Sequence, residues 1–240
     1  MSNTFSRHEA HPASETPGSQ VALIIPVYNE AAVVGTLLDE TRRVFPHIIC
    51  VDDGSTDGSA TAARATGVTV LQHSINLGQG AALQTGITYF LNRTDLPYLV
   101  TFDADGQHQT DDAVAMWKMA VAEDLDIVFG SRFLSENQEM GLTKKAVLKT
   151  AAFVTAATTK LKLTDAHNGL RLLSRRAASQ LHLKQNRMAH ASEIVAQLGK
   201  TGLPWAEAPV HIRYTDYSRA KGQSLWNSVN IIADLIMGVR

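Results

Sequence analysis

Short runs of consecutive apolar residues alternate along the chain with longer segments in which apolar residues recur every three or four positions. The runs are rich in Val, Ile and Leu and are expected to be strands, at residues 21–26, 47–53, 68–72, 97–103 and 126–133. The segments between them have helical spacing, at residues 31–44, 58–66, 78–91 and 110–122. Continuous apolar runs are typical of strands buried on both faces, and alternating strands and helices form parallel sheets. The pattern predicts a single α/β domain, with a Rossmann-like, mostly parallel sheet flanked by helices on both faces.

The pattern changes after residue 135. Residues 140–164 contain five lysines and no acidic residue, which fits either a basic helix packed on the core or one that contacts anionic lipid headgroups. Further on we expect a short strand in 167–177, a helix in 186–202, a strand in 205–214 and a terminal amphipathic helix in 224–240. The terminal helix has an apolar stripe that suits packing on the core or on a partner subunit of a homo-oligomer: Leu225, Val229, Ile232 and Ile236.

The composition narrows the class of protein. Of 240 residues, 45% are hydrophobic and 19% are charged, the usual balance for a globular domain. The 22 basic and 23 acidic side chains create no basic field, so no nucleic-acid partner is expected. Residues 1–19 are polar and lack the apolar core of a secretion signal, so we expect a disordered tail, a folded domain over 20–240 and a cytoplasmic location. No run reaches the roughly 18 apolar residues of a membrane span. The contact with a membrane that we expect is therefore peripheral, at the inner face of the cytoplasmic membrane.

Polar side chains follow each predicted strand. In a parallel sheet these positions meet at the carboxyl edge, where ligands bind. Each residue alone also fits a turn or a helix cap, so the prediction depends on their convergence at one edge. The candidates are Pro26, Tyr28, Asn29 and Glu30 after the first run, Asp52 and Asp53 after the second, Asn76, Gly78 and Gly80 after the third, Asp103 and Asp105 after the fourth, and Ser131 and Arg132 after the fifth.

The segment TFDADGQHQTDD, residues 101–112, predicts a metal site. Asp103 and Asp105 are two residues apart, so in extended backbone their side chains point to the same side. Gln107, again two residues on, adds a third oxygen. Such ligands suit Mg²⁺ or Mn²⁺, which keep open positions for substrate phosphates. Asp111 and Asp112 lie where the next helix begins and are expected to form its cap and first turn.

Two common modes of phosphate binding are not supported. No G-x-G-x-x-G follows the first predicted strand, and no G-x-x-x-x-G-K-[ST] occurs in the chain. Instead, VDDGSTDGS at residues 51–59 places two carboxylates at a strand end. A carboxylate there can accept a hydrogen bond from a ribose hydroxyl or a base N–H.

Five ordered motifs, IIPVYNE, VDDGSTDGS, NLGQGAALQTG, TFDADGQHQ and FGSRF, closely resemble those of the family 2 glycosyltransferases. The match covers about residues 20–215 and looks best to the branch of dolichyl-phosphate and polyprenyl-phosphate sugar synthases and related bacterial polysaccharide transferases. The resemblance implies the GT-A fold, in which residues 20–135 bind the nucleotide sugar and residues 136–240 bind the acceptor.

The resemblance also implies roles for single residues. Pro26, Tyr28 and Glu30 line the nucleotide pocket, and Asp52 or Asp53 reads the base or ribose. Asp103, Ala104 and Asp105 hold the donor diphosphate and its metal, whose shell Gln107 completes. Arg132 approaches the donor sugar or phosphate, Arg171 lies beside the acceptor loop, and Glu193 faces the acceptor. The synthases carry a Gly-x-Ser-Lys loop where this chain reads YTDYSRAKGQS, so Arg219 and Lys221 are its substitutes.

The resemblance implies a metal-dependent, inverting glycosyltransferase that moves a sugar from a UDP- or GDP-linked donor to polyprenyl phosphate or a lipid-linked glycan. Asp105, through the cation that neutralises the leaving phosphate, and Glu193 are the expected catalytic residues. Glu193 is the general base if the acceptor is a hydroxyl, whereas a lipid phosphate needs no base. Two alternatives stay open. One is a nucleotidyltransferase, whose Gly-rich opening loop is missing here, and the other is a catalytically silent nucleotide-sugar-binding or scaffold protein, in which damaged metal ligands are expected.

Overall fold

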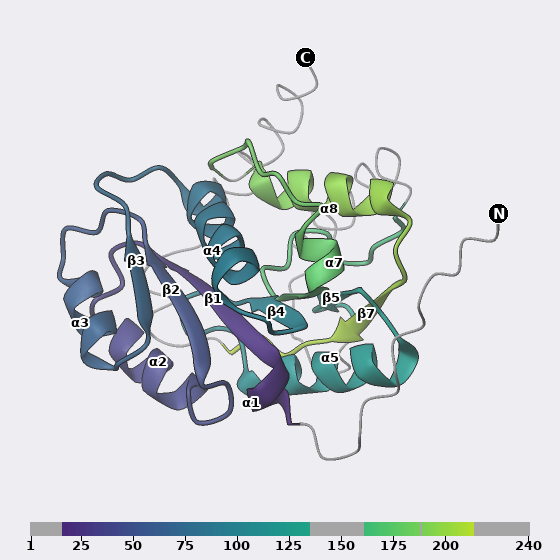
Figure 1. Ribbon diagram of the computed structural model, residues 1–240, viewed down its shortest axis with the longest axis horizontal. Helices are drawn as coiled ribbons and strands as arrows, with labels where there is room; N and C mark the ends of the chain where they lie inside the picture. The colour runs from purple at the N-terminus through teal and green to yellow at the C-terminus, as the bar shows by residue number, and fades with distance from the viewer. Residues whose placement is uncertain (1–15, 135–160, 188, 214–240) are drawn as a thin grey trace.

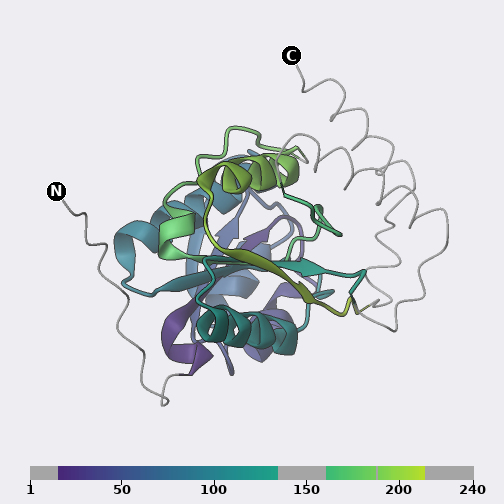
Figure 2. The ribbon, with the colours of Figure 1, turned by 90° about the vertical axis from the view of Figure 1, so that its right-hand side faces the viewer.

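The computed structural model describes residues 16–134, 161–187 and 189–213. These residues form a seven-stranded sheet in the order β3-β2-β1-β4-β6-β5-β7, with helices on both faces (Figures 1 and 2). The strands are β1 (Val21–Val27), β2 (His47–Asp52), β3 (Thr69–Gln72), β4 (Tyr98–Thr101), β5 (Ile127–Ser131), β6 (Arg171–Ser174) and β7 (Trp205–Pro209). The helices are α1 (Pro17–Gln20), α2 (Val34–Thr41), α3 (Ser59–Ala65), α4 (Gln79–Arg93), α5 (Thr110–Glu123), α7 (Arg175–Ala178) and α8 (His190–Thr201). Every strand and helix predicted within these ranges is present.

The sheet is mostly parallel, as predicted, but one strand is reversed. β6 pairs antiparallel with both β4 and β5, whereas the other neighbouring strands are parallel. The first residue of β6, Arg171, therefore lies opposite Thr101, the last residue of β4. Because of this reversal, the start of β6 joins the edge at which the parallel strands end. Strands from both halves of the chain build the same sheet.

The prediction that every strand is buried on both faces is wrong for β3. β3 lies at one edge of the sheet, and its four residues are only partly buried or exposed. β1 lies near the centre of the sheet, and all seven of its residues are buried. A short apolar run therefore identified the strand but not its place at the edge of the sheet. An edge strand has a neighbouring strand on one side only, so more of its surface stays exposed.

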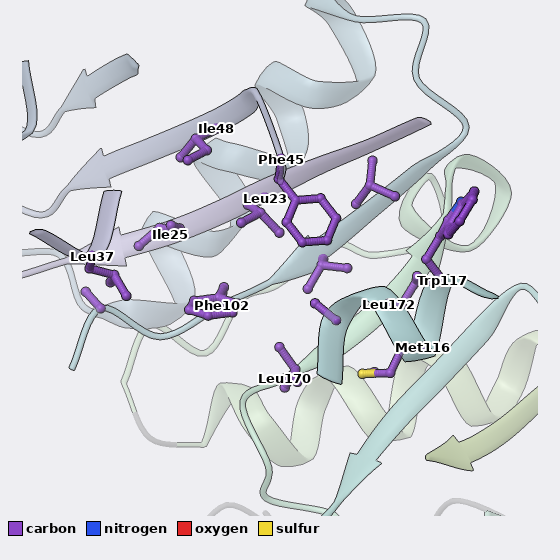
Figure 3. Close-up of a cluster of buried hydrophobic side chains, with 14 of the residues drawn as sticks. Leu23, Ile25, Leu37, Phe45, Ile48, Phe102, Met116, Trp117, Leu170 and Leu172 are labelled. Atoms are coloured by element: carbon purple, nitrogen blue, oxygen red, sulfur yellow. The ribbon is translucent and has the colours of Figure 1, made fainter. Parts of the chain in front are cut away.

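Successive residues of β1 pack against opposite layers of helices. Leu23 and Ile25 belong to a cluster that includes side chains of α2, α3 and α5 (Figure 3). Ala22 and Ile24 belong to a second cluster with side chains of α4, α7 and α8. In Figure 2, α8 lies above the sheet and α5 below it. Because a fully buried Leu or Ile contributes about 1.5–3 kcal/mol, these two clusters fix the sheet between the helix layers.

Several predictions fall outside the described residues. These are residues 1–15 of the predicted tail, most of the lysine-rich segment 140–164, and the terminal helix 224–240 with its apolar stripe. The last residues of the predicted tail are described, and the prediction of disorder is wrong there, because α1 (Pro17–Gln20) begins at residue 17. Among the residues that are described, no helix has the length and apolar character needed to cross a membrane. The predicted contacts of those segments with lipid or with a partner subunit stay predictions.

Candidate active site

A cavity of about 430 Å³ opens at the edge where β1, β2 and β4 end and β6 begins. Loops that follow β1, β2, β3 and β4 meet there, together with the first residues of α4 and α8. Ten of the residues selected from the sequence line this cavity: Pro26, Tyr28, Glu30, Asp53, Asn76, Gly78, Asp103, Ala104, Asp105 and Arg171. The structure thus brings together side chains that are up to 145 residues apart in the chain.

The carboxylate of Asp103 is held by two side chains. Its Oδ1 accepts a hydrogen bond from Gln79 Nε2 at 2.9 Å, and its Oδ2 accepts one from His108 Nε2 at 3.0 Å. Gly169 leaves the space for it, because a Cβ there would lie 2.1 Å from Asp103 Oδ2. Burial raises the pKa of Asp103, but the hydrogen bond and charge of His108 and the charge of Arg171 outweigh it, and the pKa lies below its ordinary value. Asp103 is therefore ionised at neutral pH.

Asp105 lines the same cavity in a less favourable setting. Burial, and then the negative charge of Asp103, raise the pKa of Asp105 above its ordinary value. A divalent cation would relieve this repulsion, so the two carboxylates fit Mg²⁺ or Mn²⁺. The described residues contain no group of three or more His, Cys, Asp or Glu side chains that could hold a metal. A cation at Asp103 and Asp105 would therefore depend on water or substrate oxygens for much of its shell, as Mg²⁺ commonly does.

Gln107 does not line the cavity. Its backbone N–H donates to Asp105 Oδ1 at 3.0 Å, and its carbonyl accepts from the N–H of Arg213 at 2.9 Å. Asp112 lies in the first turn of α5, as predicted, and its carboxylate accepts the N–H of His211 at 2.7 Å. These bonds connect the loop after β4 to the segment after β7.

The two carboxylates after β2 differ in their positions. Asp53 lines the cavity, and it accepts the N–H groups of Leu77 at 2.9 Å and Gly78 at 2.7 Å, as well as a hydrogen bond from His73 Nδ1 at 2.7 Å. Asp52 is fully buried: its Oδ1 accepts the N–H of Ser55 at 3.1 Å, and its Oδ2 has no hydrogen-bond partner among the described residues. Asp53 therefore fixes the loop that leads into α4, and it is the carboxylate within reach of a ligand.

The loop after β1 is fixed by the loop after β2. Asn29 has a positive φ of 54°, its Oδ1 accepts the N–H of Thr56 at 2.9 Å, and its own N–H donates to Ser55 Oγ at 2.9 Å. Tyr28, next to it, is 45% exposed and lines the cavity. The exposed ring is accessible to a ligand such as a base, and the neighbouring turn sets its position.

Residues 182–187, here called the strap, cover the start of α4 (Figure 1). The N–H of Gly80 donates to the carbonyl of Asn186 at 2.9 Å. A Cβ at Gly78 would lie 2.2 Å from that carbonyl oxygen, and a Cβ at Gly80 would lie 2.1 Å from the carbonyl oxygen of Gln185. The two glycines are therefore needed because the strap passes so close to them.

Glu193 holds the strap and does not line the cavity. Its carboxylate accepts the N–H of Lys184 at 3.0 Å, the N–H of Gln185 at 2.8 Å, and a hydrogen bond from Gln197 Nε2 at 3.1 Å. The sequence pattern suggested that this residue faces an acceptor. In the structure its oxygens are instead engaged by the backbone of a loop, which favours a positioning role over proton transfer.

The arginines that the sequence suggested have different environments. Arg132 forms a bidentate pair with Asp165, from Nε at 2.6 Å and Nη2 at 2.8 Å, and it does not line the cavity. Arg171 lines the cavity and is 2% exposed. Burial lowers the pKa of Arg171 to about 10, although Asp103 and Asp165 act in the opposite direction. Arg219 and Lys221 lie outside the described residues.

Two histidines also line the cavity. Burial and the charge of Arg171 lower the pKa of His167 to about 4, and its Nε2 has no hydrogen-bond partner among the described residues. His190 Nδ1 donates to the carbonyl of Arg187 at 2.7 Å, and burial lowers the pKa of His190. Both imidazoles are therefore neutral at pH 7.

Several contacts of this site were not predicted. They include Gln79 and His108 as partners of Asp103, and Asp165 as the partner of Arg132. The Gln-His pair that follows DAD was a local indication for His108. Nothing near residue 132 points to residue 165, because the pairing depends on the chain returning to the same edge.

The chain is similar to proteins of known classes. The family model described as glycosyl transferase family 2 matches residues 22–181. The chain is 31% identical over 241 residues to the UDP-N-acetylglucosamine–dolichyl-phosphate N-acetylglucosaminyltransferase of Methanococcus voltae, with 90% of this chain and 95% of that protein covered. It is 32% identical over 131 residues to the polyprenol monophosphomannose synthase of Mycolicibacterium smegmatis, with 51% of this chain and 49% of that protein covered.

The fold is similar to that of glucosyl-3-phosphoglycerate synthase from Mycobacterium tuberculosis, solved in complex with Mn²⁺, uridine diphosphate and phosphoglyceric acid. The TM-score is 0.67 at 17% sequence identity, with 92% of this chain and 78% of that chain covered. This similarity confirms the predicted GT-A fold.

Proposed function

The chain belongs to glycosyltransferase family 2, and we propose that it transfers a sugar from a nucleotide-diphosphate sugar to polyprenyl phosphate with inversion of the anomeric centre. The observation that carries the proposal is the pair Asp103 and Asp105 in one cavity with the loops after β1 and β2. The names of relatives that act on dolichyl phosphate or make polyprenol monophosphomannose support the choice of acceptor. Family membership favours a glycosyltransferase over the nucleotidyltransferase and silent-scaffold alternatives.

The donor would occupy the side of the cavity nearest β1 and β2. Tyr28 is accessible there for contact with a base, and Asp53 fixes the loop before α4. Gln79, the first residue of α4, also lines the cavity. The positive end of this 15-residue helix would favour the negative charge of a diphosphate.

Asp103 and Asp105 would hold Mg²⁺ or Mn²⁺, which supplies positive charge against the leaving diphosphate when it is bound. Gln79 and His108 fix the orientation of the Asp103 carboxylate, so that little rearrangement is needed when a cation arrives. Attack by the acceptor from the face opposite the leaving group would invert the anomeric centre.

A phosphate acceptor agrees with the position of Glu193. A phosphate oxygen is already anionic at neutral pH, so no residue needs to remove a proton from it. The carboxylate of Glu193 is engaged by the strap and does not line the cavity. A hydroxyl acceptor would require a base that Glu193 is poorly placed to provide.

A transfer assay tests this proposal. The full chain is incubated with radiolabelled UDP- and GDP-sugars, Mn²⁺ and a polyprenyl phosphate, and label is counted in the organic extract. We expect transfer that requires Mn²⁺ and the lipid phosphate, with kcat reduced about 100-fold or more by Asp105→Ala. Arg176→Lys is the matched control and should keep full activity. Arg176 is an exposed residue of α7 that pairs with Asp126. Full activity of Asp105→Ala, or transfer that ignores the lipid phosphate, would contradict the proposal.

A further inference from the structure

The guanidinium of Arg171 is buried, and no ion pair joins it to any residue that the structure describes. Within the described ranges, its hydrogen bonds amount to one long contact, from Nη2 to the carbonyl of Ala166 at 3.5 Å. An arginine carries five N–H donors, and a buried charge without a partner strongly destabilises a fold. Yet this side chain lies at a cavity that admits a ligand. Such an arrangement is expected of a side chain whose charge and N–H donors are satisfied by a bound anion.

The carboxylates nearest to Arg171 are engaged elsewhere. Asp103 accepts hydrogen bonds from Gln79 and His108, one on each oxygen. Asp165 accepts both arms of the Arg132 guanidinium. These carboxylates act on Arg171 through their charge, but no ion pair of 4.0 Å or less joins either of them to it in the described part of the chain. The donors of Arg171 therefore remain available for a group in the cavity.

His167 provides a second donor on the same side. It lines the cavity, and its buried Nε2 has no hydrogen-bond partner among the residues that the structure describes. A neutral imidazole with its proton on Nε2 would donate to an oxygen of the same ligand. Arg171 and His167 come from β6 and from the loop before it, so one short segment supplies both groups.

The order of strands separates this pair from the predicted donor site. Along the edge, β2 and β1 lead to Asp53 and Tyr28, β4 leads to Asp103 and Asp105, and β6 begins with Arg171. The carboxylates thus lie between the nucleotide side and Arg171. A ligand that reaches both Arg171 and the metal ligands would approach from the side opposite the nucleotide.

We propose that Arg171 and His167 form the subsite that binds the phosphate of the acceptor. The inference rests on the proposed function, and it deepens it by naming the residues that recognise the acceptor's phosphate monoester. A planar guanidinium binds two phosphate oxygens at once, and the resulting bonds are charge-assisted. The same chemistry would suit a phosphate of the donor, so the test separates the two sources.

Isothermal titration calorimetry on the full chain tests the subsite without any sugar transfer. The probes are farnesyl phosphate, inorganic phosphate, and UDP or GDP with Mn²⁺, each titrated separately. We expect Arg171→Gln to weaken farnesyl phosphate and inorganic phosphate about 30-fold or more, and to leave the nucleotide affinity within about threefold. Arg176→Gln, at an exposed site on α7, is the matched control and should change none of the affinities.

His167→Phe is the second variant, and it keeps the test decisive if Arg171→Gln fails to fold. It should weaken farnesyl phosphate about fivefold, as expected for the loss of one hydrogen bond, and His167→Gln should restore part of that loss. Unchanged phosphate affinity in either folded variant would overturn the subsite, and so would a loss confined to the nucleotide. A chain that transfers sugar but fails this test refutes the subsite alone. Failure of transfer alongside Arg171-dependent phosphate binding would refute the proposed function alone.

Discussion

Substitution of Gly80 by Ala tests whether the strap determines the shape of the cavity. The new Cβ would lie 2.1 Å from the carbonyl oxygen of Gln185 and 2.8 Å from the Cβ of His190. Ordinary van der Waals contact begins at 3.4 Å, so the strap must retreat by roughly 1.3 Å. Its hydrogen bonds to Gly80 and Glu193 would weaken as it moves.

The expected cost follows from those contacts. Loss of the bond from Gly80 N–H to Asn186 costs about 1 kcal/mol, and weaker charge-assisted bonds to Glu193 cost about 1–3 kcal/mol more. Alanine in a helix returns about 1 kcal/mol. We expect a net loss of about 1–3 kcal/mol, which lowers the Tm by about 3–8 °C for a chain of this size. The KM for the acceptor should rise as well, because the wall formed by Gly78 and His190 moves.

Gly35→Ala is the matched control. Gly35 also lies in a helix, α2, but a Cβ there meets nothing within 4 Å. This variant should therefore gain about 1 kcal/mol and keep its KM. Thermal melts and steady-state kinetics of both variants provide the measurement. If Gly80→Ala gains stability as Gly35→Ala does, the strap does not press on α4 and the reasoning is refuted.

Three further predictions concern charged groups. Asp105→Asn should raise the Tm of the metal-free protein by about 1–2 °C and abolish stabilisation by Mn²⁺, because it removes the charge that Asp103 repels; a lower Tm in calorimetry would contradict this account. Glu193→Gln should lower the Tm by about 2–4 °C and change kcat less than about threefold, since its carboxylate holds the strap; a 100-fold loss of kcat would make it a base after all. The pKa of His167 is lowered from 6.5 to about 4, so the unfolded chain binds more protons between these values, and stability should fall as the pH drops through this window. Urea unfolding at pH 4–7 should show a flatter pH dependence for His167→Phe, and an unchanged slope would argue against a buried neutral imidazole.

The rule that polar residues after parallel strands meet at the carboxyl edge of the sheet gave correct positions for the carboxylates after β2 and β4. Asp53, Asp103 and Asp105 follow their strands directly, so a correct strand assignment was enough to place them at one cavity. The same rule failed for Arg132, which follows β5 but pairs with Asp165. It also gave no information on Arg171, because it presumed parallel strands and β6 runs antiparallel.

Local patterns could not decide how Glu193 is used. Its position in the first turn of α8 follows from the sequence, since HASEIVAQLGKT has helical spacing. The partners of its carboxylate, Lys184 and Gln185, are eight or nine residues earlier, in a strap without regular structure. Only the path of that strap over α4 shows why the backbone there needs a carboxylate.

By itself, the sequence determined the strands and helices, the edge that carries the polar residues, and the pair Asp103 and Asp105. These features depend on interactions over a few residues, namely apolar periodicity and the position of polar residues soon after a strand ends. The tertiary structure alone decided the reversal of β6, the pairing of Arg132 with Asp165, and the burial of the Arg171 guanidinium at the cavity without an ion pair among the described residues. Those features depend on which distant segments share one edge of the sheet. The energy of a buried charge is set by the partners that arrive there, and not by its neighbours in the chain.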